Sequence, residues 1–494
     1  MKNEVQLITY VDRLPGGTLK HLRTLLQGPL AGLFGGVHLL PFFHRIDGAD
    51  AGFDPIDHLR VDERLGDWDD VAALGREVDL MVDVIVNHVS SKSPQFLDYS
   101  AKGAKSAYDG MFLTLKSVFP HGATERNLLE LYRPRPGLPF TTVTLQCGER
   151  RLLWTSFTGE QIDIDVRHPA GRQYLSDILA TLARAGVRMV RLDAVGYAVK
   201  KAGTSCFMLP ETFDFIAELS AEARTHGIEV LVEIHSHHRT QMKIAQRVDW
   251  VYDFALPPLV LHAFAFGTAQ PLKRWIEMRP SNAVTVLDTH DGIGIIDIGA
   301  DRSAPHERPG LVPDAELDQL VEHIHEASGG ASRRATGAAA SNLDLYQVNC
   351  TYYDALGRND LDYLLARAIQ FFLPGVPQVY YVGLLAGEND MALLAHTGVG
   401  RDINRHRYGE ADFAQALQRP VVQRLLELIR LRNTHPAFGG VFGCRSPDAH
   451  TLELQWTQGD ASASLWVDFR SREHCLALRE PGRPARRLEL GTAD

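Results

Sequence analysis

Short runs of apolar, largely β-branched residues recur along the whole chain, and longer segments with helical periodicity separate them. Most of the runs are nearly continuous in apolar character. This is typical of strands in a parallel sheet whose two faces are both covered. The pattern predicts eight strands, which begin at Val5, Gly36, Leu80, Val187, Ile228, Trp250, Ala283 and Val376.

Segments between these runs repeat apolar residues every three or four positions, as amphipathic helices do. In YLSDILATLARAG, one stripe carries Leu175, Ile178, Leu179 and Leu182, and Gly186 follows as a helix-ending signal. Similar segments are WDDVAALGREV, ETFDFIAELSAEARTHG and LDYLLARAIQFFLPG. Strands that alternate with helices in this way predict an α/β fold, a (β/α)8 TIM barrel, with a doubly wound open sheet as the alternative.

Two long stretches interrupt the alternation, and a third follows it. Residues 89–165 are rich in Gly, Pro and aromatic residues, and residues 292–355 contain ASGGASRRATGAAASN. Insertions this long within a compact domain are usually functional. After residue 436, TLELQW and ASLWVDF alternate as strands of a small antiparallel sheet do. The expected organisation is a catalytic barrel of residues 1–88, 166–291 and 356–435, an inserted domain B at 89–165, a second insertion at 292–355 and a C-terminal β domain at 436–494.

Composition limits the partners that we expect. The 494 residues include 51 Lys and Arg against 61 Asp and Glu, and the net charge of −10 argues against a nucleic-acid or anionic-membrane surface. The five cysteines are scattered and form no CxxC pair, which suits a reducing compartment and offers no zinc site. The chain lacks a secretory signal and a membrane-spanning apolar stretch, so we expect a cytoplasmic protein that acts on small molecules.

Charged and polar residues gather at the ends of four predicted strands. They are Asp83, Asn87 and His88 on the third strand, Arg191 and Asp193 on the fourth, Glu233 and His235 on the fifth, and Asp288, His290 and Asp291 on the seventh. One such residue alone is more often a cap or a structural ion pair. In a TIM barrel, however, the carboxyl ends of all strands meet at one mouth, so the set indicates a site.

Arg191 and Asp193 are two residues apart in a strand, so their side chains lie on the same face. A structural ion pair is one explanation, but buried pairs add little net stability. Retaining glycoside transfer offers another, because it needs one ionised carboxylate that attacks the anomeric carbon and one carboxylic acid that protonates the leaving oxygen. Asp193, beside a guanidinium, suits the first role. Glu233 follows the apolar run VLV and suits the second, because burial favours the protonated form of a carboxyl group.

The segments DVIVNH, VRLDAV, VEIH and VLDTHD resemble, in order, the four motifs of the α-amylase superfamily, glycoside hydrolase family thirteen. The resemblance implies that Asp193 is the nucleophile and Glu233 the acid/base. It makes Asp291 the third carboxylate, which stabilises the oxocarbenium-like transition state.

The same resemblance places His88, Arg191 and His290 in a glucose subsite. The position of Asn87 is a calcium ligand in many amylases, but the sequence gives calcium no separate support. We therefore predict no metal and no cofactor.

Phrases along nearly the entire chain, among them LPFFHRIDGADAGFDPIDH, RPRPGLPF and FFLPGVPQVYYVG, resemble the sucrose phosphorylase family. Members of that family transfer the glucosyl unit of sucrose to inorganic phosphate with retention. By position, the resemblance adds Asp50, Phe53, Phe157 and Arg401 to the glucose subsite. It also implies that fructose, and then phosphate, meets a loop of the second insertion. The implied residues outside the glucose subsite are Pro134, Arg135, Gln161, Tyr197, His235, Asp344, Leu345, Tyr346 and Gln347.

The expected products are α-D-glucose 1-phosphate and fructose, formed through a covalent glucosyl-aspartate. A retaining hydrolase or transglucosidase is one alternative, and a phosphorylase of sucrose 6'-phosphate or glucosylglycerate is another. The loop sequence DLYQ has no basic residue for a phosphorylated sugar. A barrel that serves only as a binding or trafficking subunit is disfavoured, because all three carboxylates are present and a membrane segment is absent. The expected partners are sucrose and inorganic phosphate, with neither nucleic acid nor membrane, and a homodimer is left open.

Overall fold

The structure, a computed structural model, describes residues 1–47, 50–135, 137–301, 308–336 and 347–491. Eight parallel strands close into a barrel in the order β1-β16-β13-β12-β11-β10-β5-β2. They are β1 Gln6–Thr9, β2 Gly36–Leu39, β5 Asp79–Ile85, β10 Met189–Asp193, β11 Glu229–Val232, β12 Trp250–Asp253, β13 Ala283–Thr285 and β16 Val376–Tyr380. Each strand coincides with one predicted apolar run, so the barrel is confirmed and the open sheet is excluded.

The register of β10 against its neighbours positions the charged residues of the barrel. Arg191 pairs with Asp83 of β5 on one side and with Leu231 of β11 on the other. Paired residues of neighbouring parallel strands present their side chains on the same face of the sheet. The register therefore brings Arg191 and Asp83 together.

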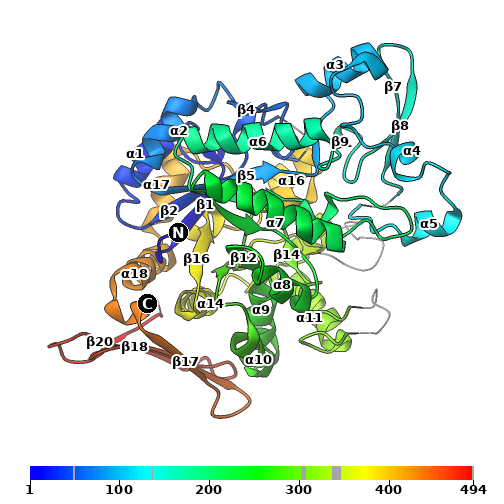
Figure 1. The fold of residues 1–494 in the computed structure, drawn as a ribbon. Helices are drawn as coiled ribbons and strands as arrows, with labels where there is room; N and C mark the ends of the chain where they lie inside the picture. Colours follow the sequence, from blue (N-terminus) through cyan, green and yellow to red (C-terminus); the bar gives the residue numbers. More distant parts are fainter. Residues whose placement is uncertain (48–49, 136, 302–307, 337–346, 492–494) are drawn as a thin grey trace.

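Helices cover the outside of the barrel, and all four of the predicted helical segments form helices. In α6, the predicted stripe of Leu175, Ile178, Leu179 and Leu182 is buried. Helices α6 and α7 run side by side across the barrel strands, joined by a hydrogen bond from Ser176 to Glu222 (Figure 1). The covering helices are α1 Leu19–Gln27, α2 Trp68–Gly75, α6 Pro169–Arg184, α7 Pro210–Thr225, α8 His238–Ala245, α9 Leu256–Phe266, α10 Gln270–Met278, α14 Asp360–Phe372, α17 Glu410–Gln418 and α18 Pro420–Thr434.

The first insertion leaves the barrel after β5 and returns through β9, which pairs with β6. Its elements are β6 His88–Ser90, α3 Pro94–Lys102, α4 Leu115–Val118, α5 Glu125–Glu130, β7 Phe140–Thr144, β8 Arg150–Trp154 and β9 Gln161–Asp163. It has a small core of its own around Phe119 and Trp154. We propose that this unit is the domain B expected at residues 89–165.

The second insertion contains a short pair of strands, β14 Ile293–Gly294 with β15 Gln347–Val348, and the helices α11 Asp314–Ala327, α12 Ala331–Thr336 and α13 Tyr352–Ala355. Of the four predicted loop residues, Gln347 lies in β15. Asp344, Leu345 and Tyr346 lie outside the described residues.

Short strands, helices and 3-10 turns complete the fold. They are β3 Phe43–His44, β4 Asp57–Val61, α15 Tyr381–Leu384, α16 Met391–Thr397 and the 3-10 turns η1 Val11–Arg13, η2 Gly103–Lys105, η3 Val195–Tyr197, η4 Gly400–Asn404 and η5 Pro436–Gly439.

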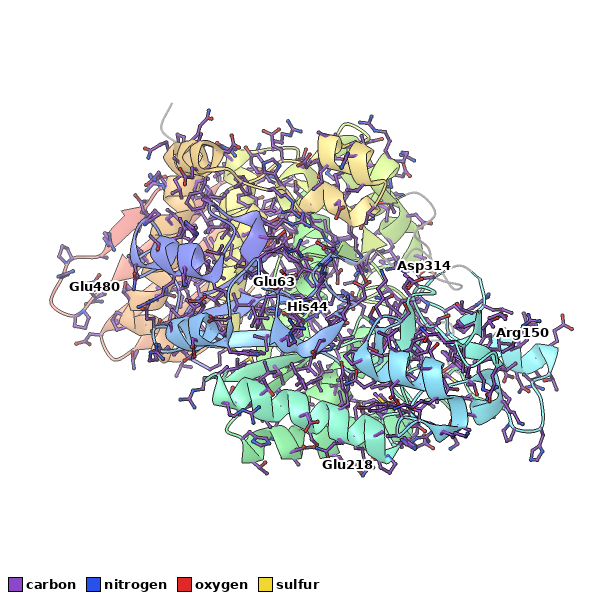
Figure 2. The ribbon with its side chains drawn as sticks, turned by 90° about the horizontal axis from the view of Figure 1, so that it is seen from above. His44, Glu63, Arg150, Glu218, Asp314 and Glu480 are labelled. Carbon is purple, nitrogen blue, oxygen red and sulfur yellow. The ribbon has the colours of Figure 1, made fainter. Side chains whose placement is uncertain are left out.

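The C-terminal part forms the predicted antiparallel sheet, with five strands in the order β17-β18-β19-β20-β21. The strands are β17 Val441–Arg445, β18 Thr451–Gln458, β19 Ala461–Asp468, β20 His474–Arg479 and β21 Arg486–Leu488. The indole N–H of Trp456 donates to the carbonyl of Phe372 at 2.7 Å and joins the sheet to α14. Figure 2 shows Arg150 of β8 and Glu480, next to β20, at opposite ends of the molecule. Among the described residues, every helix is too short or too polar to cross a membrane.

Replacing Ile178 with alanine should lower the free energy of unfolding by about 2–5 kcal/mol, because the truncation leaves a cavity between α6 and the barrel. Asp177→Ala, at the exposed neighbouring position, is the matched control and should change little. Urea unfolding measures both. Equal stability of the two variants would contradict the packing described for α6.

Candidate active site

A buried arginine, Arg191, lies at the centre of the acidic groups in the barrel mouth. Its Nη1 is 2.5 Å from Asp83 Oδ1 and 2.8 Å from Asp193 Oδ1. Its Nη2 is 3.4 Å from Glu233 Oε1. The side chain of Asp83 is fully buried, whereas those of Asp193 and Glu233 each remain 14% exposed. One guanidinium therefore contacts two carboxylates that face the pocket, Asp193 and Glu233, and a third, Asp83, that is buried beneath them.

Asp83 is fixed from its other side by His38, whose Nε2 lies 3.0 Å from Asp83 Oδ2. Burial by itself raises the pKa of Asp83, but His38 and Arg191 outweigh it and hold that pKa below its ordinary value. Asp83 therefore remains ionised and keeps Arg191 in place.

The chain turns sharply after Asp193. Ala194 adopts a left-handed conformation with φ of 55°, uncommon for a residue with a side chain. Its N–H donates to Glu233 Oε2 at 3.3 Å, and the chain continues into the turn η3. The turn leaves Asp193 on the rim and brings Tyr197 to the pocket wall.

The two rim carboxylates, Asp193 and Glu233, share the guanidinium of Arg191. Burial raises the pKa of Asp193 well above its ordinary value. Arg191 opposes this, in the direction expected from the sequence, and Glu233 adds to the rise. Arg191 approaches Asp193 more closely than Glu233. Of the two, Asp193 therefore has the better compensated negative charge.

The opposite wall carries a second acid–arginine pair. Arg401 Nη1 lies 2.7 Å from Asp291 Oδ1 and 3.9 Å from Asp50 Oδ1. Burial raises the pKa of Asp291, but Arg401 and other cations outweigh it and place that pKa well below its ordinary value. Next to it, burial lowers the pKa of His290 to about 3, so this histidine is neutral and stacks on Phe53 at 4.7 Å between ring centroids.

Aromatic rings form the rest of the wall. Burial lowers the pKa of His88, whose Nε2 donates to the carbonyl of Phe53 at 2.9 Å. The ring of Phe157 lies between His88, at 5.4 Å, and Tyr197, at 5.1 Å. Phe207 packs on Tyr197 at 4.8 Å. Flat, uncharged surfaces of this kind suit the faces of a sugar ring.

The pocket and the open solvent space at its mouth together hold about 730 Å³. Most of the residues proposed from the sequence line it. These are Asp50, Phe53, His88, Pro134, Arg135, Phe157, Asp193, Tyr197, Glu233, His235, His290, Asp291, Gln347 and Arg401.

Two proposed residues lie elsewhere among the described ones. Arg191 lies beneath the pocket and acts through the carboxylates. Gln161 is buried in β9, away from the pocket wall, and its amide has no hydrogen-bond partner among the described residues.

Sequence reasoning missed four lining residues, namely Ala194, Gly196, Phe207 and Ile234. Three of them stand beside predicted residues, so adjacency to a motif could have indicated them. Phe207 has no such signal, because a loop beyond η3 brings it to the pocket.

The calcium position of many amylases does not fit a metal here. Lys200 Nζ lies 2.8 Å from Asp163 Oδ2 and donates to Asn87 Oδ1 at 2.9 Å and to the carbonyl of Tyr197. An ammonium group thus already satisfies both Asn87 and Asp163, and a metal ion would be repelled by it.

Another group of described residues could also reach one ion. Ligand atoms of Glu233, His235 and Asp291 lie within 4.8 Å of one another. Arg191 and Arg401 already compensate these carboxylates, so we assign no metal there.

The fold and the pocket together define a carbohydrate-active (β/α)8 enzyme. Residues 32–278 match the family described as alpha amylase, catalytic domain. The chain is 61% identical over 469 residues to a sucrose phosphorylase of Agrobacterium vitis, covering 95% of this chain and 96% of that protein. It is 56% identical over 465 residues to a sucrose phosphorylase of Bifidobacterium adolescentis, covering 94% of this chain and 92% of that protein.

A solved structure extends the likeness to three dimensions. Sucrose 6F-phosphate phosphorylase from Thermoanaerobacter thermosaccharolyticum superposes with a TM-score of 0.91 at 38% identity, covering 99% of this chain and 98% of that one. The chain belongs to the α-amylase family. Within that family, the resemblance to sucrose phosphorylases expected from the sequence is confirmed.

Lys200→Met should lower the free energy of unfolding by about 3–5 kcal/mol, because Asp163 would stay buried without its counter-charge. Lys201→Met removes a neighbouring exposed ion pair with Glu211 and should lower the free energy of unfolding much less, because solvent screens that pair. Adding Asp163→Asn to Lys200→Met should recover part of the loss. Urea unfolding checks all three, and equal losses for the two lysines would refute the buried pair.

Proposed function

We propose that this enzyme transfers the glucosyl unit of sucrose to inorganic phosphate and releases α-D-glucose 1-phosphate and fructose. The observation that carries the proposal is the pair of rim carboxylates on one buried guanidinium, in a pocket whose wall also carries Arg135. Similarity over nearly the full length to two sucrose phosphorylases supports it.

In the first half of the reaction, an oxygen of Asp193 attacks the anomeric carbon of the glucosyl unit. The glycosidic bond breaks, and Glu233 gives its proton to the oxygen that departs with fructose. Asp291, which Arg401 keeps ionised, binds sugar hydroxyls and stabilises the oxocarbenium-like transition state. The product is an ester between glucose and Asp193.

The glucose half of the pocket matches the sugar by charge and shape. We propose that it consists of Asp50, Phe53, His88, Phe157, His290 and Arg401. Its two histidines are neutral, so they offer hydrogen bonds and flat surfaces without adding charge beside the developing cation.

In the second half, a phosphate oxygen attacks the same carbon, its proton passes to Glu233, and the ester bond to Asp193 breaks. Two displacements restore the original α configuration. Water, at about 55 M against phosphate at roughly 10 mM, has a concentration advantage of about 5,000-fold, which corresponds to about 5 kcal/mol. Charge-assisted hydrogen bonds contribute roughly 1.5–3 kcal/mol each, and Arg135 is partly buried in the pocket wall where phosphate would bind.

The remaining acceptor contacts are proposed for Pro134, Tyr197, His235 and Gln347, which line the same pocket. We also propose a cytoplasmic location, which the five free cysteines and the supply of phosphate there support.

The test of the function is product analysis of sucrose, phosphate and enzyme, with the anomer identified by NMR. We expect α-D-glucose 1-phosphate and fructose at a rate that depends on phosphate. Free glucose at an unchanged rate without phosphate would identify a retaining hydrolase. Turnover only with sucrose 6'-phosphate or glucosylglycerate would identify a related phosphorylase.

Asp193→Asn should lower turnover by more than about 1,000-fold, because the neutral amide cannot attack the anomeric carbon. Its thermal unfolding should stay close to that of the unsubstituted enzyme. Mass spectrometry of Glu233→Gln with α-D-glucosyl fluoride, whose fluoride leaves without a proton, should locate glucose on Asp193. Retained activity in Asp193→Asn, or glucose on another residue, would refute the assignment.

Arg135→Ala should lower kcat/KM for phosphate by about 10–100-fold, since at least one charge-assisted hydrogen bond is lost. The share of glucose released by hydrolysis should rise accordingly. Arg133→Ala removes a nearby arginine that donates to the carbonyl of Gly137, and it serves as the control. An unchanged partition in Arg135→Ala would mean that phosphate binds elsewhere.

A further inference from the structure

A buried aspartate, Asp297, lies behind the pocket wall in contact with His235. Its Oδ2 is 2.8 Å from His235 Nδ1. Its Oδ1 accepts from the backbone N–H of Ser236 at 3.1 Å and from Gln241 Nε2 at 2.7 Å. Three partners therefore fix this carboxylate, although it lies outside every sequence motif that indicated the site.

The packing around the pair leaves little room for movement. A Cβ atom at Gly294 would lie 2.2 Å from Asp297 Oδ2 and 2.9 Å from His235 Nδ1. Only glycine allows β14 to approach this closely. On its other side, the His235 ring stacks on Phe254 at 3.9 Å.

The contacts determine which nitrogen of His235 carries hydrogen. An ionised carboxylate only accepts, so Nδ1 donates to Asp297. The other nitrogen, Nε2, lies 3.1 Å from Gln347 Nε2. The amide oxygen of Gln347 accepts from Arg401 at 3.2 Å, so its NH₂ group points at His235.

His235 can therefore adopt two states. When the ring is neutral, Nε2 accepts from Gln347. When the ring is protonated, its Nε2–H group faces the NH₂ group of Gln347, and two donors cannot bond to each other. Gln347 must then move away, and the Nε2–H group can donate to an anion in the pocket.

Several charged groups act on His235. Glu233, at the end of β11, lies 3.9 Å from Nε2, and Asp291 follows β13 on the facing wall. Arg401 acts through Gln347, and Arg135 lines the same pocket. Burial lowers the pKa of His235, but Asp297 and Glu233 outweigh it, so that pKa is raised.

We propose that Asp297 is a positioning residue for the acceptor half of the reaction. It orients His235 so that the imidazole donates an N–H to the phosphate that attacks the glucosyl enzyme. The inference rests on the proposed function. According to this inference, Asp297 makes the enzyme favour an anionic acceptor over a neutral one.

Asp297→Asn is the direct test. The amide oxygen can still accept from Ser236 and Gln241, but the NH₂ group would face His235 Nδ1 and reverse the tautomer. With α-D-glucosyl fluoride as donor, KM for phosphate should rise by about 3–10-fold, because the reversed tautomer still donates from Nε2 but without the positive charge of the protonated ring. Hydrolysis without phosphate should stay within about threefold, because Asp193 and Glu233 are untouched.

The pH profile gives a readout that a purely structural role would not move. Because the pKa of His235 is raised in the folded enzyme, its second N–H is present at low pH and lost as pH rises through that pKa. In the unsubstituted enzyme, kcat/KM for phosphate should fall across this range. In Asp297→Asn this fall should flatten, because the neutral ring of that variant already carries hydrogen on Nε2. Titration of phosphate itself affects both enzymes equally.

A double-mutant cycle separates action through His235 from a general loss of stability. Once His235→Gln has removed the imidazole, adding Asp297→Asn should change KM for phosphate by less than about twofold. Asp354→Asn is the control for burial. It changes a buried aspartate that accepts from Thr351 and Asn389, outside the pocket wall.

The inference would be overturned if folded Asp297→Asn kept both the KM for phosphate and the pH profile of the unsubstituted enzyme. It would also be overturned if the increases in KM caused by Asp297→Asn and His235→Gln multiplied fully in the double variant. If Asp297→Asn does not fold, His235→Gln decides. Loss of the alkaline fall in that variant supports the proposal, and its persistence overturns it. Absence of any phosphate-dependent product from the unsubstituted enzyme would instead refute the proposed function.

Discussion

One buried guanidinium supports both the barrel mouth and its chemistry. Arg191 must compensate Asp83, Asp193 and Glu233 at once, and a buried carboxylate without compensation is strongly unfavourable. The register of β10 on β5 supplies the first contact, and the left-handed turn at Ala194 helps to supply the last. A shift of either strand would separate charges that cannot be left alone in the barrel interior. The electrostatics of the site therefore also select the register of the fold.

In the assignment proposed above, the pocket divides by charge into a glucose half and an acceptor half. On the glucose side, burial keeps His88 and His290 neutral, and the negative charge is concentrated on carboxylates that face the developing oxocarbenium ion. On the acceptor side, Arg135 and His235 provide groups that can meet an anion. Gln347 lies between the halves, since its amide joins Arg401 to His235. The arrangement separates stabilisation of a cation from binding of an anion within one pocket.

The barrel strands were well predicted from the sequence. Strands covered on both faces appear as continuous apolar runs that end in charged residues, and both signals are local. The same logic indicated Asp193, Glu233 and Asp291, and the family resemblance added residues such as Asp50 and Arg401. Asp297, Lys200 and Phe207 could not be found in this way. Each acts on groups far away in the sequence, and nothing in its own neighbours records that contact. Asp344, Leu345 and Tyr346 remain predictions, and so does Gln161, which is buried in β9 and is not among the residues that line the pocket.

Lys200 connects elements of the pocket wall through its charge, as Arg191 connects the carboxylates. Its ammonium group joins Asp163 of the first insertion, Asn87 at the end of β5 and the backbone of Tyr197. Asn87 in turn lies 3.4 Å from His88 Nδ1, and His88 holds the backbone of Phe53. The first insertion is thus attached to the barrel through a charge next to the proposed glucose subsite. A substitution that loosens this attachment should disturb sugar binding before it disturbs the carboxylates, because Arg191 and its carboxylate partners belong to barrel strands and the turns directly after them, not to the first insertion.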